Sequence, residues 1–135
     1  SSKSRGNLWR YWKMTPEGLK FISKTLKPLV NYHFLYYKTD KVEYPYWVGE
    51  YLENEYSAET NYQGTTFILT GVTRGSYLEL EKQKEIIKKA LKDKRAILSS
   101  GTGIAVHYDY SMSIRTDDIE LQKIQINLTI QEWEV

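Results

Sequence analysis

The side chains best suited to chemistry in this sequence are two histidines, and neither has the neighbours that such chemistry requires. His33 and His107 each lie in a stretch that we expect to form a β-strand. A metal site needs several His, Cys, Asp or Glu ligands at a characteristic spacing, and neither histidine has such partners nearby. We therefore expect both histidines on polar strand faces, and we expect neither a metal ion nor a cofactor.

Two other segments have residue types that bind ions, but in the wrong arrangement. Asp109, Asp117, Asp118 and Glu120 could offer oxygen atoms to a hard cation, yet they lack the spacing of a calcium loop and indicate a solvated turn. Residues 99–103, Ser-Ser-Gly-Thr-Gly, lack the Gly-Lys-Ser/Thr ending of a phosphate loop and lead into a strand. The chain has no cysteine and shows no nucleophile elbow or Ser/His/Asp set. We predict that the protein is not an enzyme.

Aromatic residues are the more informative group, with 12 tyrosines and 4 tryptophans in 135 residues. Five of the aromatic residues crowd one strand and the loop after it, which is more than one face of a sheet can easily bury: Tyr44, Tyr46, Trp47, Tyr51 and Tyr56. Tyrosine and tryptophan concentrate at protein interfaces because they combine a large contact area with a polar group. The alternative is that half of them line the core while the others shield an edge. The predicted contact residues for a subunit or partner are Tyr44, Tyr46, Trp47, Tyr51, Tyr56 and Trp133.

Charge divides the chain into two parts. Residues 1–13 contain four basic residues and no acid, whereas residues 14–135 contain 15 basic and 17 acidic residues. We interpret residues 1–13 as a tag remnant or upstream read-through, and residues 14–135 as a single domain. The alternative function is a small nucleic-acid-binding module, which would use Trp9 to Lys13 together with a lysine-rich helix.

The order of elements follows from the hydrophobic pattern. Thr15 is placed to cap a helix that starts at Pro16, and Ser76 with Glu79 forms a capping box at the start of an amphipathic helix over about 76–93. Strands are expected near 32–37, 44–53, 65–73 and 104–110, and the longest near 123–131, where apolar and polar residues alternate. The sequence predicts an α+β fold of order α-β-β-β-α-β-β. We expect a single, mostly antiparallel sheet with the amphipathic helix packed on one face.

This arrangement resembles the tail terminator and tail-completion (tail-to-head joining) proteins of long-tailed bacteriophages. The resemblance covers residues 14–135 and rests on the short first helix, on Tyr44-Pro45-Tyr46-Trp47-Val48 entering a strand, and on the strand from Gln63 to Thr73. It continues through the helix from Ser76 to Asp93 and the closing pair of strands, where residues 117–122 precede the last strand.

The resemblance implies a structural virion protein without catalytic activity, assembled in the host cytoplasm and located at the head-proximal end of the tail. Such subunits close into rings, commonly hexamers, that stop polymerisation of the tail tube protein and face the head connector. Genome DNA passes through the ring without tight binding, and no membrane is involved. The loops 54–64 and 95–103 are candidates for contacts with neighbouring subunits or the tube.

Overall fold

The longest strand, β6 (Leu121–Glu134), separates apolar from polar side chains as its alternating sequence predicts. In the computed structural model, which describes residues 14–53 and 64–134, four apolar side chains at alternate positions of β6 are at most 1% exposed. They lie on the face of the sheet that forms the core, which we call the inner face. These residues are Ile124, Ile126, Leu128 and Ile130.

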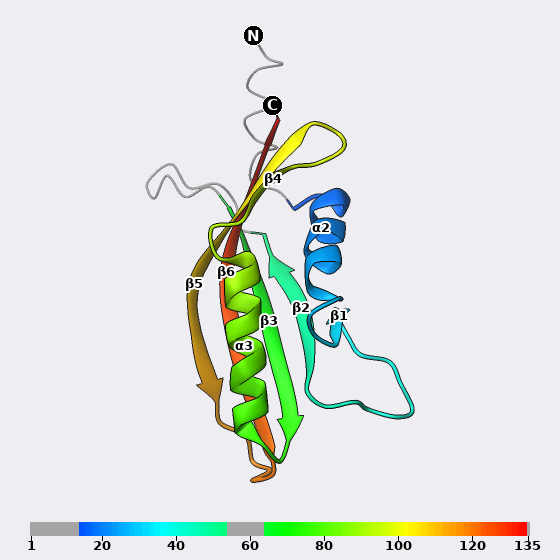
Figure 1. Ribbon diagram of the computed structural model, residues 1–135, viewed down its shortest axis with the longest axis vertical. Helices are drawn as coiled ribbons and strands as arrows, with labels where there is room; N and C mark the ends of the chain where they lie inside the picture. The colour runs from blue at the N-terminus through cyan, green and yellow to red at the C-terminus, as the bar shows by residue number, and fades with distance from the viewer. Residues whose placement is uncertain (1–13, 54–63, 135) are drawn as a thin grey trace.

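β6 lies inside a curled six-stranded sheet of order β1-β2-β3-β6-β5-β4 (Figure 1). The preceding elements, in chain order, are α2 (Pro16–Leu26), β1 (Tyr32–Phe34), β2 (Tyr46–Leu52), β3 (Thr65–Arg74), α3 (Tyr77–Leu91), β4 (Arg95–Ile97) and β5 (Thr102–Ile114). The α+β class is confirmed, and so is the placement of the amphipathic helix on the sheet.

The sheet is mixed, which corrects the expectation of a mostly antiparallel sheet. β1 pairs with β2 in parallel, with Tyr32 opposite Trp47, whereas the other neighbouring strands are antiparallel. The parallel pair arises because the loop between β1 and β2 returns the chain to the start of β1 before β2 begins. At the two ends of β1, backbone hydrogen bonds run from Trp47 N–H to the Asn31 carbonyl at 2.8 Å and from Leu35 N–H to the Gly49 carbonyl at 2.8 Å.

The predicted element order lacks one strand. The sequence pattern predicts a loop at residues 95–97, but these residues form β4, which pairs with residues 103–105 of β5. In residues 14–53 and 64–134, the observed order is therefore α-β-β-β-α-β-β-β. A three-residue strand with exposed ends has too little alternation for a sequence pattern to reveal it.

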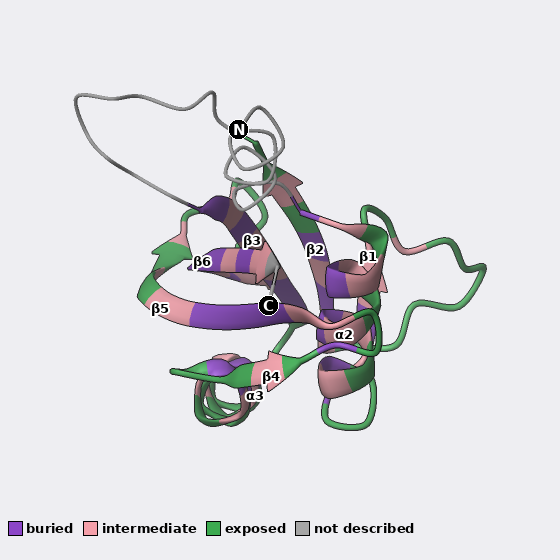
Figure 2. Ribbon diagram, turned by 90° about the horizontal axis from the view of Figure 1, so that it is seen from above, coloured by how far each residue is buried: buried purple, intermediate pink, exposed green. Residues whose placement is uncertain are grey.

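Both helices lie on the inner face of the sheet (Figure 2). Ile22 and Leu26 of α2 share one core cluster with Leu80, Ile87 and Leu91 of α3, and each of these side chains is 0% exposed. No helix in residues 14–53 or 64–134 covers the opposite face, which we call the outer face.

The start of α2 is held by a carboxylate from the far end of the chain. The Thr15 hydroxyl accepts a hydrogen bond from Gly18 N–H at 3.0 Å and donates one to Oε1 of Glu132 at 2.5 Å. Thr15 N–H also donates to Oε2 of Glu132 at 2.8 Å. Glu132 is only 3% exposed, and this burial raises the pKa of its carboxyl group, although the hydrogen bonds from Thr15 act in the opposite direction. The predicted Thr15 cap is confirmed, and Glu132 ties it to β6.

The predicted capping box at α3 is wrong. Ser76 occupies the N-cap position, but its side chain forms no capping hydrogen bond. The neighbouring Gly75 N–H instead bonds to the Glu120 carbonyl at 3.1 Å, so contacts with the β5–β6 turn fix the entry to the helix.

Trp47 fixes α3 against the sheet. Its ring lies against Gly71 of the neighbouring β3, where a Cβ atom would come within 2.6 Å of the ring, so only glycine fits there without displacement. The indole Nε1–H donates to Oε1 of Gln83 on α3 at 2.9 Å. One side chain thereby connects two strands and the helix.

Trp47→Ala should lower the free energy of unfolding by about 3–5 kcal/mol, because it empties a fully buried site. That is a large share of a typical stability of about 5–15 kcal/mol. Urea denaturation followed by circular dichroism measures the loss. Trp47→Phe keeps most of the ring volume and should cost clearly less, so equal losses in the two variants would contradict the packing role.

Glu132 should make stability depend on pH. Because the pKa of the folded carboxyl group is raised above 4.5, its contribution to stability is present at low pH and declines as pH rises through the folded pKa. Glu132→Gln removes the titration and should flatten the curve of unfolding free energy against pH above 4.5. Denaturation at a series of pH values tests this, and identical slopes in the two proteins would contradict it.

Candidate functional site

The structure divides the predicted contact residues between the two faces of the sheet. Strand alternation places Tyr46 on the outer face, and Trp47 and Tyr51 on the inner face. Tyr44 immediately precedes β2 and is 40% exposed, and Trp133 lies on the outer face near the end of β6. Tyr56 lies outside the described residues.

Trp47 and Tyr51 are the two predicted contact residues that face the core. Trp47 is 0% exposed, so it offers no surface to a partner. The prediction that Trp47 is a contact residue is therefore wrong. The half-buried Tyr51 stacks with Phe34 of β1 at 6.1 Å between ring centroids. The alternation of a β-strand accounts for both positions, because every second residue of β2 faces the helices.

The outer-face tyrosines form a connected row of rings at the β1–β2 edge. His33 stacks on Tyr37 at 3.9 Å, Tyr37 contacts Tyr46 at 5.0 Å, and Tyr46 contacts Tyr44 at 5.7 Å between centroids. We call these four residues the aromatic row. His33 and Tyr37 were not predicted as contact residues, although the dense aromatic run from Tyr32 to Tyr37 was a signal that could have indicated them.

The environment of the aromatic row shifts the pKa values of two of its members. Burial, assisted by the positive charge of Lys27, lowers the pKa of His33, whose Nε2 lies 2.7 Å from Oδ1 of Asn31. Burial raises the pKa of Tyr46, and the neighbouring Tyr44 and Tyr37 add to this effect. Both shifts favour uncharged rings, so the row presents a neutral surface.

Arg74 anchors the end of the aromatic row to the β5–β6 turn. Its guanidinium group donates hydrogen bonds to Tyr44 and, at 3.0 Å, to Oδ2 of Asp118, and these contacts raise its pKa. Glu120 lies 3.8 Å from the same nitrogen. Asp118 and Glu120 therefore take part in a surface ion-pair network with Arg74. Such a network is compatible with the solvated turn that the sequence predicts.

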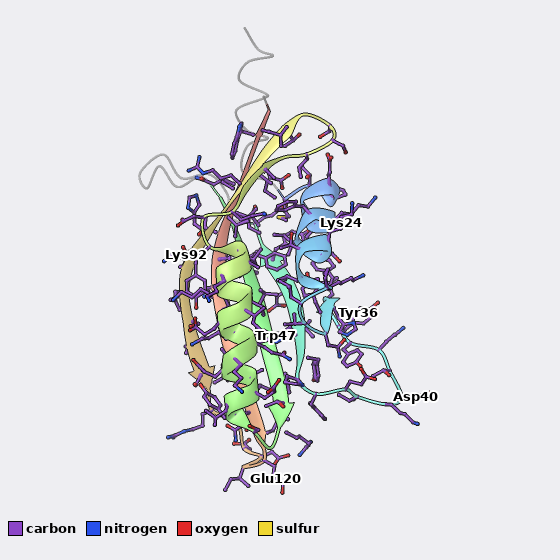
Figure 3. All side chains as sticks on the ribbon, in the orientation of Figure 1. Lys24, Tyr36, Asp40, Trp47, Lys92 and Glu120 are labelled. Atoms are coloured by element: carbon purple, nitrogen blue, oxygen red, sulfur yellow. The ribbon has the colours of Figure 1, made fainter. Side chains whose placement is uncertain are left out.

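The loop between β1 and β2 extends the exposed apolar surface beside the aromatic row. Tyr36 and Asp40 mark this loop as it projects from the edge of the sheet (Figure 3). Leu35 is 54% exposed and Tyr36 is 62% exposed. Large exposed apolar side chains next to a tyrosine-rich row are typical of a protein contact surface.

Trp133 belongs to a second patch, toward the opposite edge of the sheet. Its ring covers Gly103 of β5, where a Cβ atom would collide with the indole. Gly103 in turn pairs with Ile97 of β4, whose side chain is 64% exposed. We call Ile97, Gly103 and Trp133 the β4–β6 patch.

The lysine-rich face of α3 is partly engaged within the molecule. Lys84 forms an ion pair with Glu81 and lies 3.6 Å from Glu85, and the contact with Glu81 raises its pKa. The ammonium group of Lys88 lies 5.0 Å from the centre of the Tyr108 ring. These contacts reduce the charge that the helix offers to a nucleic acid.

Within residues 14–53 and 64–134, no group of three or more His, Cys, Asp or Glu side chains is placed to hold a metal ion. Nor does any helix of these residues have the length and apolar character needed to cross a membrane. A pocket of about 170 Å³ lies between the start of α3 and the end of β5, where the Tyr77 hydroxyl is 2.6 Å from Oγ of Ser113.

No protein-family model and no curated protein matches this chain. Among solved structures, the chain is similar to a chain of a structure described as the virion of a native gene transfer agent (GTA) particle. The TM-score is 0.62, the sequence identity is 11%, and the match covers 98% of each chain. The likeness is one of fold. It extends over nearly the whole length of both chains.

Tyr46→Ala should lower the free energy of unfolding by about 1–3 kcal/mol, because it removes two ring contacts that each contribute about 0.5–1.5 kcal/mol beyond buried area. Tyr46→Phe keeps both ring contacts and should stay close to the parent protein. Urea titration of both variants measures the difference. If the two variants lost the same stability, the hydroxyl rather than the ring would be responsible.

Proposed function

We propose that this chain is a structural subunit of a phage-like virion, which assembles into a ring at the head-proximal end of the tail tube. The observation that carries the proposal is the fold similarity to a chain from a gene transfer agent virion, since it covers 98% of both chains. The sequence resemblance to tail terminator and tail-to-head joining proteins supports the position in the tail. The role involves no catalysis and no cofactor.

The distribution of contact surfaces supports a ring. A closed ring requires a heterologous contact, in which two different patches of each subunit meet. The aromatic row lies at the β1–β2 edge, and the β4–β6 patch lies toward the other edge of the same sheet. Both patches offer tyrosine or tryptophan, which commonly carry much of the binding energy of an interface. A hexamer is the ring size that the resemblance favours.

In this role, the subunit caps the tail tube and presents a surface to the head connector. The slightly acidic balance of residues 14–135, with 15 basic and 17 acidic residues, suits a ring through which DNA passes without tight binding. The partners are copies of the subunit, the tube protein and the head connector, and the location is the virion.

The decisive test measures the mass of the purified protein, alone and after mixing with the tail tube protein of the same particle. We expect a closed oligomer, or one that forms on the tube and stops its growth. A strict monomer that neither caps nor joins tubes would contradict the proposal. DNA binding at low salt that weakens steeply with added salt would favour the nucleic-acid-binding alternative instead.

Tyr44→Ser should weaken ring assembly by at least about tenfold, because truncating an interface tyrosine at the centre of a contact commonly costs about 2 kcal/mol. Tyr44 is 40% exposed, so the fold should tolerate the change. Leu78→Ser, at a 72% exposed position on α3, is the matched control and should leave assembly unchanged. If Tyr44→Ser assembled as well as the parent protein, the aromatic row would not be part of the ring contact.

A further inference from the structure

β5 has a long backbone edge without a partner strand in the described part of the chain. β4 pairs only with residues 103–105, and the last backbone bond on that side runs from Val106 N–H to the Lys94 carbonyl at 2.8 Å. Beyond that bond, β5 continues to Ile114 along the side of the molecule (Figure 1). An unpaired strand edge of this kind is a template for pairing with another chain.

Proteins usually protect such edges with charges, prolines or β-bulges. The first part of this edge is protected in that way, because the pairing with β6 is irregular between Tyr108 and Tyr110, and Asp109 is exposed there. The carboxylate of Asp109 accepts a hydrogen bond from the Thr129 hydroxyl at 2.6 Å, which holds it in place.

The rest of the edge lacks these protections. Residues 110–114 read Tyr-Ser-Met-Ser-Ile, without charge and without proline, in a chain that is 27% charged. Tyr110 is 51% exposed and Met112 is 50% exposed, and both lie on the outer face. The inner side of this edge is also not filled, because Ser111 and Ser113 line the pocket of about 170 Å³ beside α3.

We propose that the β5 edge pairs with the β5 edge of a second copy, antiparallel and centred on Met112. The pattern of large and small side chains is symmetric about this residue. In that register, Met112 lies opposite its own counterpart, Tyr110 lies opposite Ile114, and the small residue Ser111 lies opposite Ser113. The contact is therefore self-complementary, as a two-fold contact requires.

Charge complementarity supports a second copy as the occupant. The same register places position 109 of one copy opposite position 115 of the other, at both ends of the contact, so the Arg115 side chain can reach toward the Asp109 carboxylate that Thr129 holds on the outer face. Arg115 is exposed and forms no ion pair within residues 14–53 and 64–134. Opposite charges in cross-strand positions stabilise a strand pair, and like charges destabilise it. This contact goes beyond the proposed ring. It joins two copies of the subunit about a two-fold axis, so it doubles the mass of the assembly that the other surfaces form.

The test uses opposite charges at the centre of symmetry. Met112→Lys and Met112→Glu should each lose the two-fold contact, with self-association weakened by at least about tenfold, because like charges meet across the dyad. An equal mixture of the two variants should restore the doubled mass, which native mass spectrometry distinguishes from either variant alone. Leu29→Lys, at a 43% exposed position after α2, is the matched control and should keep the contact.

A second pair of variants tests the register. Asp109→Arg alone and Arg115→Asp alone should each weaken the contact, and the double variant should recover it, because exchanging the charges restores the ion pairs. Circular dichroism checks that each variant is folded.

A parent protein whose mass never doubles at high concentration would overturn the proposal. So would a Met112→Lys variant that associates as well as the parent, or a mixture that recovers nothing. These outcomes concern doubling only. Loss of ring formation and tube capping would instead count against the proposed function.

Discussion

The contact between Trp47, Gly71 and Gln83 joins two strands of the sheet to the helix that covers its inner face. Because Gly71 has no side chain, the indole ring can lie against β3, and its N–H reaches α3 at 2.9 Å. This contact holds α3 on the inner face, where its apolar residues join those of α2 in one core. Within residues 14–53 and 64–134, both helices are used on one face, so the outer face offers its strands and edges for assembly.

This asymmetry gives the fold its proposed use as a building block. The outer face presents the aromatic row at one edge and the β4–β6 patch toward the other, while the free edge of β5 offers backbone groups. A subunit with two unlike patches can form a closed ring, and a self-complementary strand edge can join two assemblies. The same fold occurs, over nearly the full length of both chains, in a chain of a structure described as the virion of a native gene transfer agent particle.

Sequence patterns predicted the long elements well, because burial imposes the periods that they show. The alternation along β6 and the Thr15 cap of α2 were both confirmed.

The patterns failed where local backbone conformation or long-range contacts decide the structure. β1 ends early because Leu35 adopts a positive φ of 71°, β4 is too short to show a period, and contacts with a distant turn replace the capping box at Ser76. Aromatic content indicated a contact surface, but only strand register shows that Trp47 faces inward and that His33 joins Tyr37.

We propose that this domain closes into rings through surfaces that its own helices leave uncovered. Electron micrographs of the purified protein, alone and together with tail tubes, test it most directly. We expect closed rings of uniform size, either free or seated on one end of each tube. Single particles of monomer size in both preparations, with tubes that keep growing, would contradict it.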